Sequence, residues 1–416
     1  MNFPGMGESS ADRLLHSAIL LLSLAAFGSS ISLRVTDAML PRLASEFSVL
    51  LADASWVITW FSIAYGASQL FFGPLGDRFG KYLVVAVACA GCSVTNLLCA
   101  LAPSFAMLLA ARFLAGCTAA AIIPLSMAWI GDVIPYKDRL PVLARFLVGQ
   151  ILGVSAGVLA GGFAADNFSW WVPFASIAAL FAGTSLLLLR LNRRLPAHAK
   201  VIHPGSETGL HRMLVGFRNV LINPWARVVL LTVCLEGASV FGAFAFIATH
   251  LHQVHRISLS MAGALVMLFG FGGLLFAAWA KVISRKFGEA GLAFWGGICL
   301  ALSLFVIGIA PDWWWAMLGA FAAGFGFYML HNVLQINATQ MAPERRGAAV
   351  AAFASCFYIG QSVGVAVAGW LVGKIGTGLV IEAGAAVLLI VALAFSRLRL
   401  KLPAVGREVE KGMLNP

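Results

Sequence analysis

The chain has 416 residues, of which 61% are hydrophobic and 11% are charged, and its mean hydropathy is +0.91. Soluble globular domains carry about 25% charged residues, so this composition excludes a soluble domain and indicates a membrane protein. The net charge of +11 would favour binding to nucleic acid, but the basic residues gather in alternate connections between apolar runs. That distribution is a membrane-orientation signal, so we expect a lipid bilayer and no nucleic acid as partner.

A membrane-spanning helix needs about 20 apolar residues. We expect twelve spans, at residues 16–40, 52–74, 81–102, 104–128, 142–165, 169–190, 226–249, 259–280, 290–310, 312–334, 348–372 and 376–396. The polar stretch 191–225 predicts a cytoplasmic linker between an N-terminal bundle (1–190) and a C-terminal bundle (226–396), followed by a tail at 397–416. The expected fold is an all-α membrane protein with two pseudo-symmetric six-helix bundles.

Basic residues predict the orientation. With the N-terminus inside, almost all of them lie on the cytoplasmic side, and only Arg42, Arg256 and Lys374 face outside. We interpret the first apolar run as a retained helix because many further spans follow it and no clear cleavage site is present. The expected location is a bacterial inner membrane, with both termini in the cytoplasm.

Two short patterns occur once in each half of the chain. Gly149-Gln150-x-x-Gly153-Val154 recurs as Gly360-Gln361-x-x-Gly364-Val365, and Arg78-Phe79-Gly80 is echoed by Lys286-Phe287-Gly288. Repeated halves are typical of secondary transporters, whose sites lie at the interface between the repeats.

A charged, glycine-flanked segment, Gly73-Pro-Leu-Gly-Asp77-Arg78-Phe-Gly80-Lys81, separates the second and third spans. Its composition predicts a tight helix-loop-helix turn, because Gly80 tolerates positive φ and the basic residues stay with the lipid headgroups. The segment resembles the signature loop between helices 2 and 3 of major facilitator superfamily transporters, although its second basic residue is missing.

That resemblance implies a conformational switch made of Gly73, Asp77, Arg78, Gly80 and Asp132. Asp132 matches the family's acidic residue at the inner end of helix 4. We expect it to join Arg78 in a cytoplasmic charge network that locks the outward-facing state.

Ionisable side chains within the spans each cost at least about 2.5–3.5 kcal/mol, so each needs a reason. They concentrate in spans 1, 4, 7 and 10, where the residues are Arg34, Asp37, Arg112, Glu236 and His331. The occurrence of ionisable residues in every third helix suits a bundle in which these four helices line a wet central cavity. The family resemblance implies the same arrangement.

Four of these residues are candidates for proton coupling. Arg34 and Asp37 are three residues apart and share a helix face, so they form either a structural ion pair or a proton carrier. Thr36-Asp37-Ala-Met-Leu-Pro41 resembles the T-D-x-x-L-P of Bcr/CflA-type drug exporters. Glu236 is either a coupling carboxylate or a neutral, hydrogen-bonded structural residue.

The fourth candidate is Arg112, in a segment that resembles the family's R-x-x-x-G motif, where the arginine is associated with proton transfer. From the residues alone, Arg112 either acts on a nearby carboxylate or braces span 1 against span 4. A buried arginine rarely occurs without a partner.

Candidate substrate contacts are Tyr328, His331, Asn332 and Gln335, which form one polar stripe on span 10. The alternative is that the stripe provides hydrogen bonds between helices. Phe244 offers aromatic surface for a lipophilic cation, with ordinary packing as its alternative.

Span 5 carries small residues at four-residue spacing, at Gly153, Gly157, Gly161 and Gly162. Such residues let helix backbones approach closely. The series resembles the antiporter motif G-x-x-x-G-P-x-x-G-G, with Val158 in the place of the proline. It implies antiport, with uptake as the alternative.

No catalytic residue, metal or cofactor is expected, and the energy source would be the proton gradient. There is no P-loop for ATP. A solvated outer loop accounts for His250-x-His252-x-x-His255 better than a metal site does.

The sequence therefore predicts a monomeric, proton-coupled exporter of drugs or other small amphipathic compounds, and not an enzyme. One alternative is a proton-coupled symporter or exporter of a defined metabolite, such as a sugar or an amino acid derivative. A second alternative is a transporter-like sensor that binds a ligand without moving it.

Overall fold

The computed structural model describes residues 10–196, 199–200, 209–342 and 346–401, and within these ranges the fold is entirely helical. Part of the expected linker and most of the expected tail lie outside the described residues. The helices are α1 (Ser10–Arg34), α2 (Leu40–Glu46), α3 (Leu51–Ala54), α4 (Trp56–Phe79), α5 (Lys81–Ala100), α6 (Phe105–Ala119), α7 (Ile122–Val133), α8 (Tyr136–Asn167), α9 (Val172–Arg194), α10 (Gly209–Ile222), α11 (Pro224–His255), α12 (Leu259–Ile309), α13 (Trp315–Gln340) and α14 (Arg346–Leu400).

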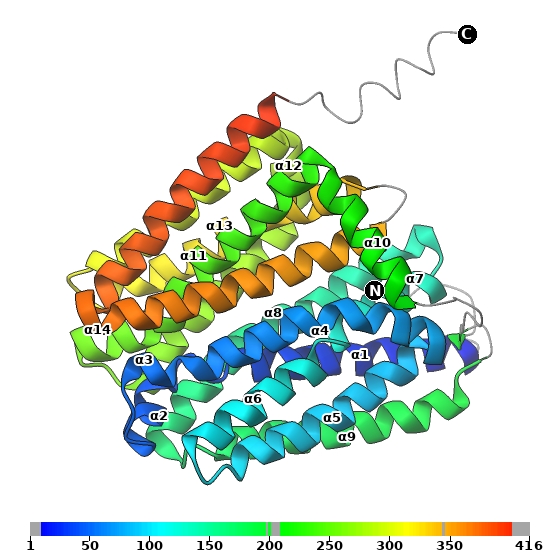
Figure 1. Cartoon of the computed structure of the whole chain (residues 1–416), viewed down its shortest axis with the longest axis horizontal. Coiled ribbons are helices and arrows are strands. Elements are labelled where there is room, and N and C mark those ends of the chain that lie inside the picture. The colour runs from blue at the N-terminus through cyan, green and yellow to red at the C-terminus, as the bar shows by residue number, and fades with distance from the viewer. Residues whose placement is uncertain (1–9, 197–198, 201–208, 343–345, 402–416) are drawn as a thin grey trace.

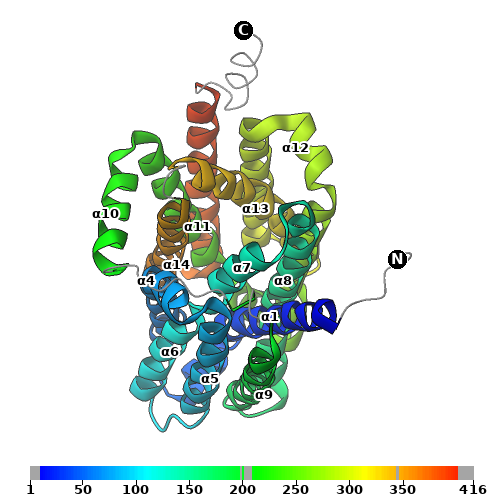
Figure 2. The same ribbon diagram turned by 90° about the vertical axis from the view of Figure 1, so that its right-hand side faces the viewer.

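The helices form two groups that follow the order of the chain. Helices α1–α9 make one bundle and α11–α14 the other, and α10 runs along the outside of the second (Figures 1 and 2). We call these bundles the N-half and the C-half. The expected fold class, an all-α membrane protein of two related bundles, is confirmed.

Nine helices of the described residues are long and apolar enough to cross a membrane, and the bent pair of α2 with α3–α4 makes a tenth candidate. Two of the nine are too long for one crossing: the 51 residues of α12 would extend about 76 Å, more than twice the hydrocarbon thickness of about 30 Å. Helix α12 breaks at Gly288 (φ 63°) and α14 breaks at Gly376 (φ 82°). Two crossings for each would give the expected twelve, a number that stays a prediction.

The turn after the second span is tighter than expected. Helix α4 continues through Gly73 and Pro74 to Phe79, and α5 begins at Lys81. Only Gly80 interrupts the helix, with φ 89°, which an L side chain rarely adopts. Gly288 has the same role in the C-half, so the echo between the two halves is confirmed in the backbone.

The first span is shorter than the expected 16–40. Helix α1 ends at Arg34, residues 35–39 form a turn, and α2 begins at Leu40 with Pro41 in its first turn. Proline lacks a backbone N–H and cannot continue the hydrogen-bonding pattern of α1. The turn carries Asp37 at the end of the helix.

A glycine stripe on α8 packs against α1 in four-residue steps. An added Cβ would meet Ser23 from Gly149, Phe27 from Gly153, Ile31 from Gly157 and Val35 from Gly161. In the C-half, Gly360 and Gly364 of α14 meet Cys234 and Ala238 of α11 in the same way, displaced by one constant shift along the chain. The repeat predicted from the sequence is thus a repeat of backbone packing.

The two ends of the molecule differ. The Gly80 end holds Gly80, Gly288 and the first residues of α1; the Asp166 end holds Asp166, Arg256 and Gly376. Toward the Asp166 end, the helices of the two halves lie side by side, and toward the Gly80 end their ribbons diverge (Figure 1).

Hydrogen bonds join the halves from mid-bundle to the Asp166 end. The carboxylate of Asp166 in α8 accepts hydrogen bonds from the backbone N–H groups of Leu259 (3.3 Å) and Ser260 (2.6 Å) at the start of α12. A carboxylate at a helix N-terminus is favourable, since the N-terminal N–H groups there are otherwise unpaired. Nearer the middle, the Ser155 hydroxyl donates to the Met267 carbonyl at 3.0 Å. The structure is therefore closed at the Asp166 end.

The glycine stripe supports a stability prediction. In Gly161→Ala, the new Cβ would overlap the backbone carbonyl oxygen of Val35, so α1 or α8 must shift. Overpacking of this kind costs about 1–3 kcal/mol, and we expect a lower unfolding temperature in detergent. Gly183→Ala is the control, because a Cβ there meets nothing within 4 Å. Equal unfolding temperatures for the two variants would contradict the close packing.

Candidate functional site

The first part of the site is the ion pair that closes α1. Arg34 Nη1 lies 3.5 Å from Asp37 Oδ2, and each side chain is 2% exposed. The second carboxylate oxygen, Asp37 Oδ1, has no hydrogen-bond partner among the described residues. The pairing expected from the spacing is confirmed, but at 3.5 Å it is looser than the 2.7–2.9 Å that is typical of such contacts.

Arg34 has its better contact in the other half. Its Nη2 donates to the side-chain oxygen of Gln361 on α14 at 2.9 Å, and the Gln361 amide nitrogen donates to the Ser62 hydroxyl on α4 at 2.7 Å. Gln361 is fully buried. This residue of the C-half is therefore held between two helices of the N-half. The sequence repeat includes Gln361 but does not predict this role for it.

The face of the Arg34 guanidinium is covered by aromatic rings of α11. Its central carbon lies 3.8 Å from the ring centroid of Phe241 and 5.5 Å from that of Phe244. Cations are attracted to ring faces at these distances, most strongly when both are desolvated. Phe244 is 3% exposed and packs against Arg34, and its expected contact with a substrate stays a prediction.

The second part of the site lies wholly in the C-half. His331 Nδ1 of α13 is 2.8 Å from Glu236 Oε2 of α11, and the Glu236 side chain is fully buried. Glu236 Oε1 has no hydrogen-bond partner among the described residues. His331 was expected in the substrate stripe and Glu236 had no expected partner, so their pairing is a finding of the structure.

Aromatic rings connect the two pairs. The His331 ring lies 5.0 Å from Phe327 and 4.8 Å from Phe357. Phe241, which covers Arg34, lies 5.5 Å from both of those rings. The polar groups of α1 and α13 are thus separated by a layer of phenylalanine rings.

The other residues of the span-10 stripe differ in exposure. Tyr328 and Asn332 are half-buried and Gln335 is exposed. The Tyr328 ring lies 6.3 Å from Phe269 of α12. Their contact with a substrate stays a prediction.

Arg112 braces three helices. Its Nη1 donates to the Ser32 carbonyl of α1 at 2.8 Å, and its Nε donates to the Val57 carbonyl of α4 at 3.1 Å. The guanidinium lies 4.2 Å from the Phe61 ring centroid. Among the ion pairs of the described residues none includes Arg112. The bracing alternative fits this geometry, and a role in proton transfer stays a prediction.

The expected switch at the Gly80 end is built around Lys81. Lys81 Nζ lies 2.7 Å from Asp132 and 3.2 Å from Asp77. In this structure the Arg78 guanidinium lies over the Phe79 ring at 5.1 Å. The expected network of Asp132 with Arg78 in the outward-facing state stays a prediction. Helix α5 begins directly after Gly80, which places Lys81 between α4 and α7.

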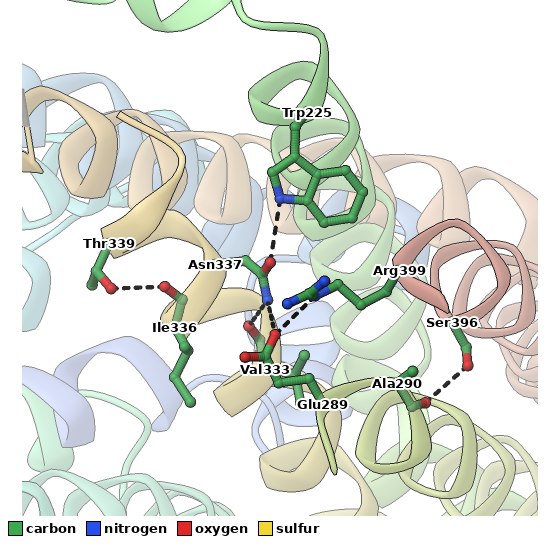
Figure 3. A network of polar contacts seen from close by, with 9 residues as sticks. All are labelled: Trp225, Glu289, Ala290, Val333, Ile336, Asn337, Thr339, Ser396 and Arg399. Carbon is green, nitrogen blue, oxygen red and sulfur yellow. Dashed lines mark hydrogen bonds and ion pairs between the residues drawn. The ribbon is translucent and has the colours of Figure 1, made fainter. Parts of the chain in front are cut away.

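The C-half has a network at the equivalent place, with the charges reversed (Figure 3). Glu289, the residue after Gly288, accepts hydrogen bonds from Asn337 of α13 (3.0 Å) and from Arg399 of α14 (2.9 Å). Trp225 of α11 donates to the Asn337 side-chain oxygen at 3.3 Å. Each half thus ties its own helices together at the Gly80 end.

The expectation of a solvated loop at residues 250–255 was wrong. Helix α11 continues to His255, and His250 is 3% exposed, with Nδ1 2.9 Å from the Thr377 hydroxyl of α14. In the part of the chain that the structure describes, no group of three or more His, Cys, Asp or Glu is arranged to hold a metal ion.

Comparison with known proteins identifies the family. The family model "Major Facilitator Superfamily" matches residues 22–343 and 257–413. The uncharacterized transporter YceJ of Bacillus subtilis is 27% identical over 337 residues, covering 80% of this chain and 83% of YceJ. The multidrug export protein EmrB of Haemophilus influenzae is 27% identical over 199 residues, covering 47% of this chain and 38% of EmrB.

The fold also matches a solved structure. A bacterial homologue of the human lysosomal transporter Spinster, solved in an inward-facing, unoccupied conformation, matches with a TM-score of 0.72 at 19% identity, over 94% of this chain and 99% of that one. With the family model matching most of the chain, this protein belongs to the major facilitator superfamily of membrane transporters.

Proposed function

We propose that this protein is a proton-coupled exporter that exchanges protons for small amphipathic compounds by alternating access. The observation that carries the proposal is the presence of two buried carboxyl groups, Asp37 and Glu236, one in each half. Each has one oxygen beside a basic side chain and one oxygen without a partner among the described residues. Buried charges are costly, and in membrane proteins such groups often carry protons.

The proposed orientation places the Gly80 end in the cytoplasm. Around that end the described helices carry many of the chain's basic residues, including Arg78, Lys81, Arg193, Lys286 and Arg397. Arg42, Arg256 and Lys374 lie toward the Asp166 end. An excess of lysine and arginine marks the cytoplasmic side of membrane proteins. With this orientation, in a bacterial inner membrane, the structure closed at the Asp166 end is the inward-facing state.

Export is supported by two further observations. The relative EmrB is named a multidrug export protein, and the α8 stripe Gly153, Gly157 and Gly161 retains the glycines of the antiporter motif. In the structure these glycines hold α8 against α1, the helix that ends at Arg34. A rigid α1–α8 unit would move as one body when the halves rock about the site.

The substrate class follows from charge. Protonation of Asp37 removes the negative charge beside Arg34, and protonation of Glu236 removes the negative charge beside His331. At an effective dielectric constant of about 20, like charges about 4 Å apart repel by about 4 kcal/mol. A cationic substrate and a bound proton would therefore exclude each other, which is the requirement for exchange.

The first test is solute-driven proton movement. Purified protein is placed in proteoliposomes with an imposed pH gradient and an internal pH dye, and lipophilic cations, sugars and amino acids are added singly. We expect proton release driven by a lipophilic cation. Proton movement only with a sugar or an amino acid, in the direction of that solute, would instead make the protein a symporter.

The second test neutralises the buried carboxyl groups. We expect Asp37→Asn and Glu236→Gln each to lower proton-driven exchange at least about tenfold, equivalent to 1.4 kcal/mol, because an amide cannot release a proton. Cation exchange without net proton movement should persist. Glu382→Gln is the matched control, since Glu382 lies toward the Asp166 end of α14, against Gly308, and away from both pairs. Full proton-driven exchange in both variants would overturn the assignment.

A further inference from the structure

We propose that Gln361 and Asp37 compete for the Arg34 guanidinium, so that the protonation state of Asp37 sets the strength of the contact between the halves. This inference rests on the proposed proton coupling and adds the element that transmits it. Gln361 is a positioning residue, because it acts through Arg34 and Ser62.

The geometry shows which competitor holds Arg34 in this state. The contact to neutral Gln361 is short, at 2.9 Å, and the contact to Asp37 is long, at 3.5 Å. An ionised carboxylate normally attracts a guanidinium to 2.7–2.9 Å, often through two parallel bonds. The observed preference for the amide is the one expected when Asp37 carries a proton.

Ionisation of Asp37 reverses the preference. The carboxylate then draws Arg34 into a close ion pair, and Gln361 loses its charged hydrogen-bond partner. Gln361 remains bound only to Ser62 of α4. Since both bonds of Gln361 cross between the halves, loss of one weakens the closed Asp166 end and favours its opening.

The sign of this effect agrees with exchange. A proton taken up by Asp37 from outside returns Arg34 to Gln361 and closes the Asp166 end. Release of the proton to the cytoplasm frees the halves to open outward with substrate. A symporter's proton has the same sign, because it also favours inward movement, so the direction in which the solute moves distinguishes the two modes.

Other charged and titratable groups act on the pair without replacing Gln361. Arg112 of α6 interacts electrostatically with Asp37, and Tyr328 of α13 and Tyr358 of α14 interact electrostatically with Arg34. Among the described residues none of these three forms a hydrogen bond to either member of the pair, and Arg112 is bound to the carbonyls of Ser32 and Val57. Gln361 is the direct competitor that spans the halves.

The chain supplies two matched controls. Gln150 occupies the position of the repeat that corresponds to Gln361, is half-buried, and has no hydrogen-bonded side-chain partner among the described residues. Ser362 is adjacent to Gln361 and also bridges the halves, donating to the Thr59 carbonyl at 3.1 Å, but it does not touch Arg34. Gln150→Ala tests whether truncation of the equivalent glutamine changes the distances by itself. Ser362→Ala tests the loss of a contact between the halves that does not involve Asp37.

The experiment measures the distance across the Asp166 end without substrate. Spin labels are attached through ketone-bearing residues at positions 53 and 374, the exposed sites of Asp53 on α3 and Lys374 on α14. The native cysteines stay in place. Distance distributions are recorded in proteoliposomes at acidic and alkaline pH for the labelled parent, Asp37→Asn, Gln361→Ala and the two controls.

In the parent, short distances should dominate at acidic pH and long distances should gain at alkaline pH. Asp37→Asn should stay short at both pH values. Gln361→Ala should raise the long-to-short ratio at acidic pH about tenfold, the effect of losing a hydrogen bond to a charged group, and should lose most of the pH response. Gln150→Ala should match the parent, and Ser362→Ala should lengthen distances while keeping the pH response.

Ser62→Ala provides a second variant if Gln361→Ala does not fold, and it should show the same loss in weaker form. A parental pH response in both Gln361→Ala and Ser62→Ala, or the same behaviour in Gln361→Ala and Ser362→Ala, would overturn the inference. If either result came with proton-driven exchange, only the role of Gln361 would be overturned and the proposed function would stand. A parent without any pH response, and without proton-driven exchange, would overturn the proposed function as well.

Discussion

Arg34 is a cation buried where the two halves of the molecule meet, and its charge must be satisfied there. Its partners come from both sides: Asp37 from its own half, and Gln361 and the Phe241 ring from the other. Removal of all of them would leave an unpaired, desolvated charge, which is far more costly than the loss of an ordinary contact. The halves therefore cannot separate at the Asp166 end unless Arg34 exchanges one partner for another.

The backbone of the two halves is symmetric, but their chemistry is not. Gly149 and Gly360 make the same close contact with the first helix of their own half. The glutamines that follow them differ, because Gln361 is clamped between helices of the other half and Gln150 has no such partner. The same holds after the positive-φ glycines, where Lys81 in one half corresponds to Glu289 in the other. The two halves thus share a backbone framework and differ in the polar residues that it carries.

Some of this could be predicted from the sequence, and the limits have physical causes. Arg34 and Asp37 are three residues apart, so helix geometry alone brought them together. Glu236 and His331 lie on different helices, and no pattern of spacing specifies which polar residue of one span meets which of another. In this structure Asp132 pairs with Lys81, because the backbone break is confined to Gly80 and α5 begins at Lys81. A shift of a few residues in a predicted helix end changes which side chain faces the neighbouring helix.

The absence of the antiporter-motif proline also has a structural consequence. Val158 allows α8 to remain continuous from Tyr136 to Asn167, and its carbonyl is approached by Gly263 of α12 in the other half. A proline at that position would remove a backbone hydrogen bond and kink the helix. A continuous α8 holds its two contacts, with α1 on one face and with α12 on the other, at fixed positions relative to each other. The packing of Gly263 on the Val158 carbonyl is uncharged, and the Asp166 carboxylate that also joins α8 to α12 lies at the exposed end of α8. In the proposed mechanism, the buried proton-dependent contact between the halves is therefore the one made by Arg34, Asp37 and Gln361.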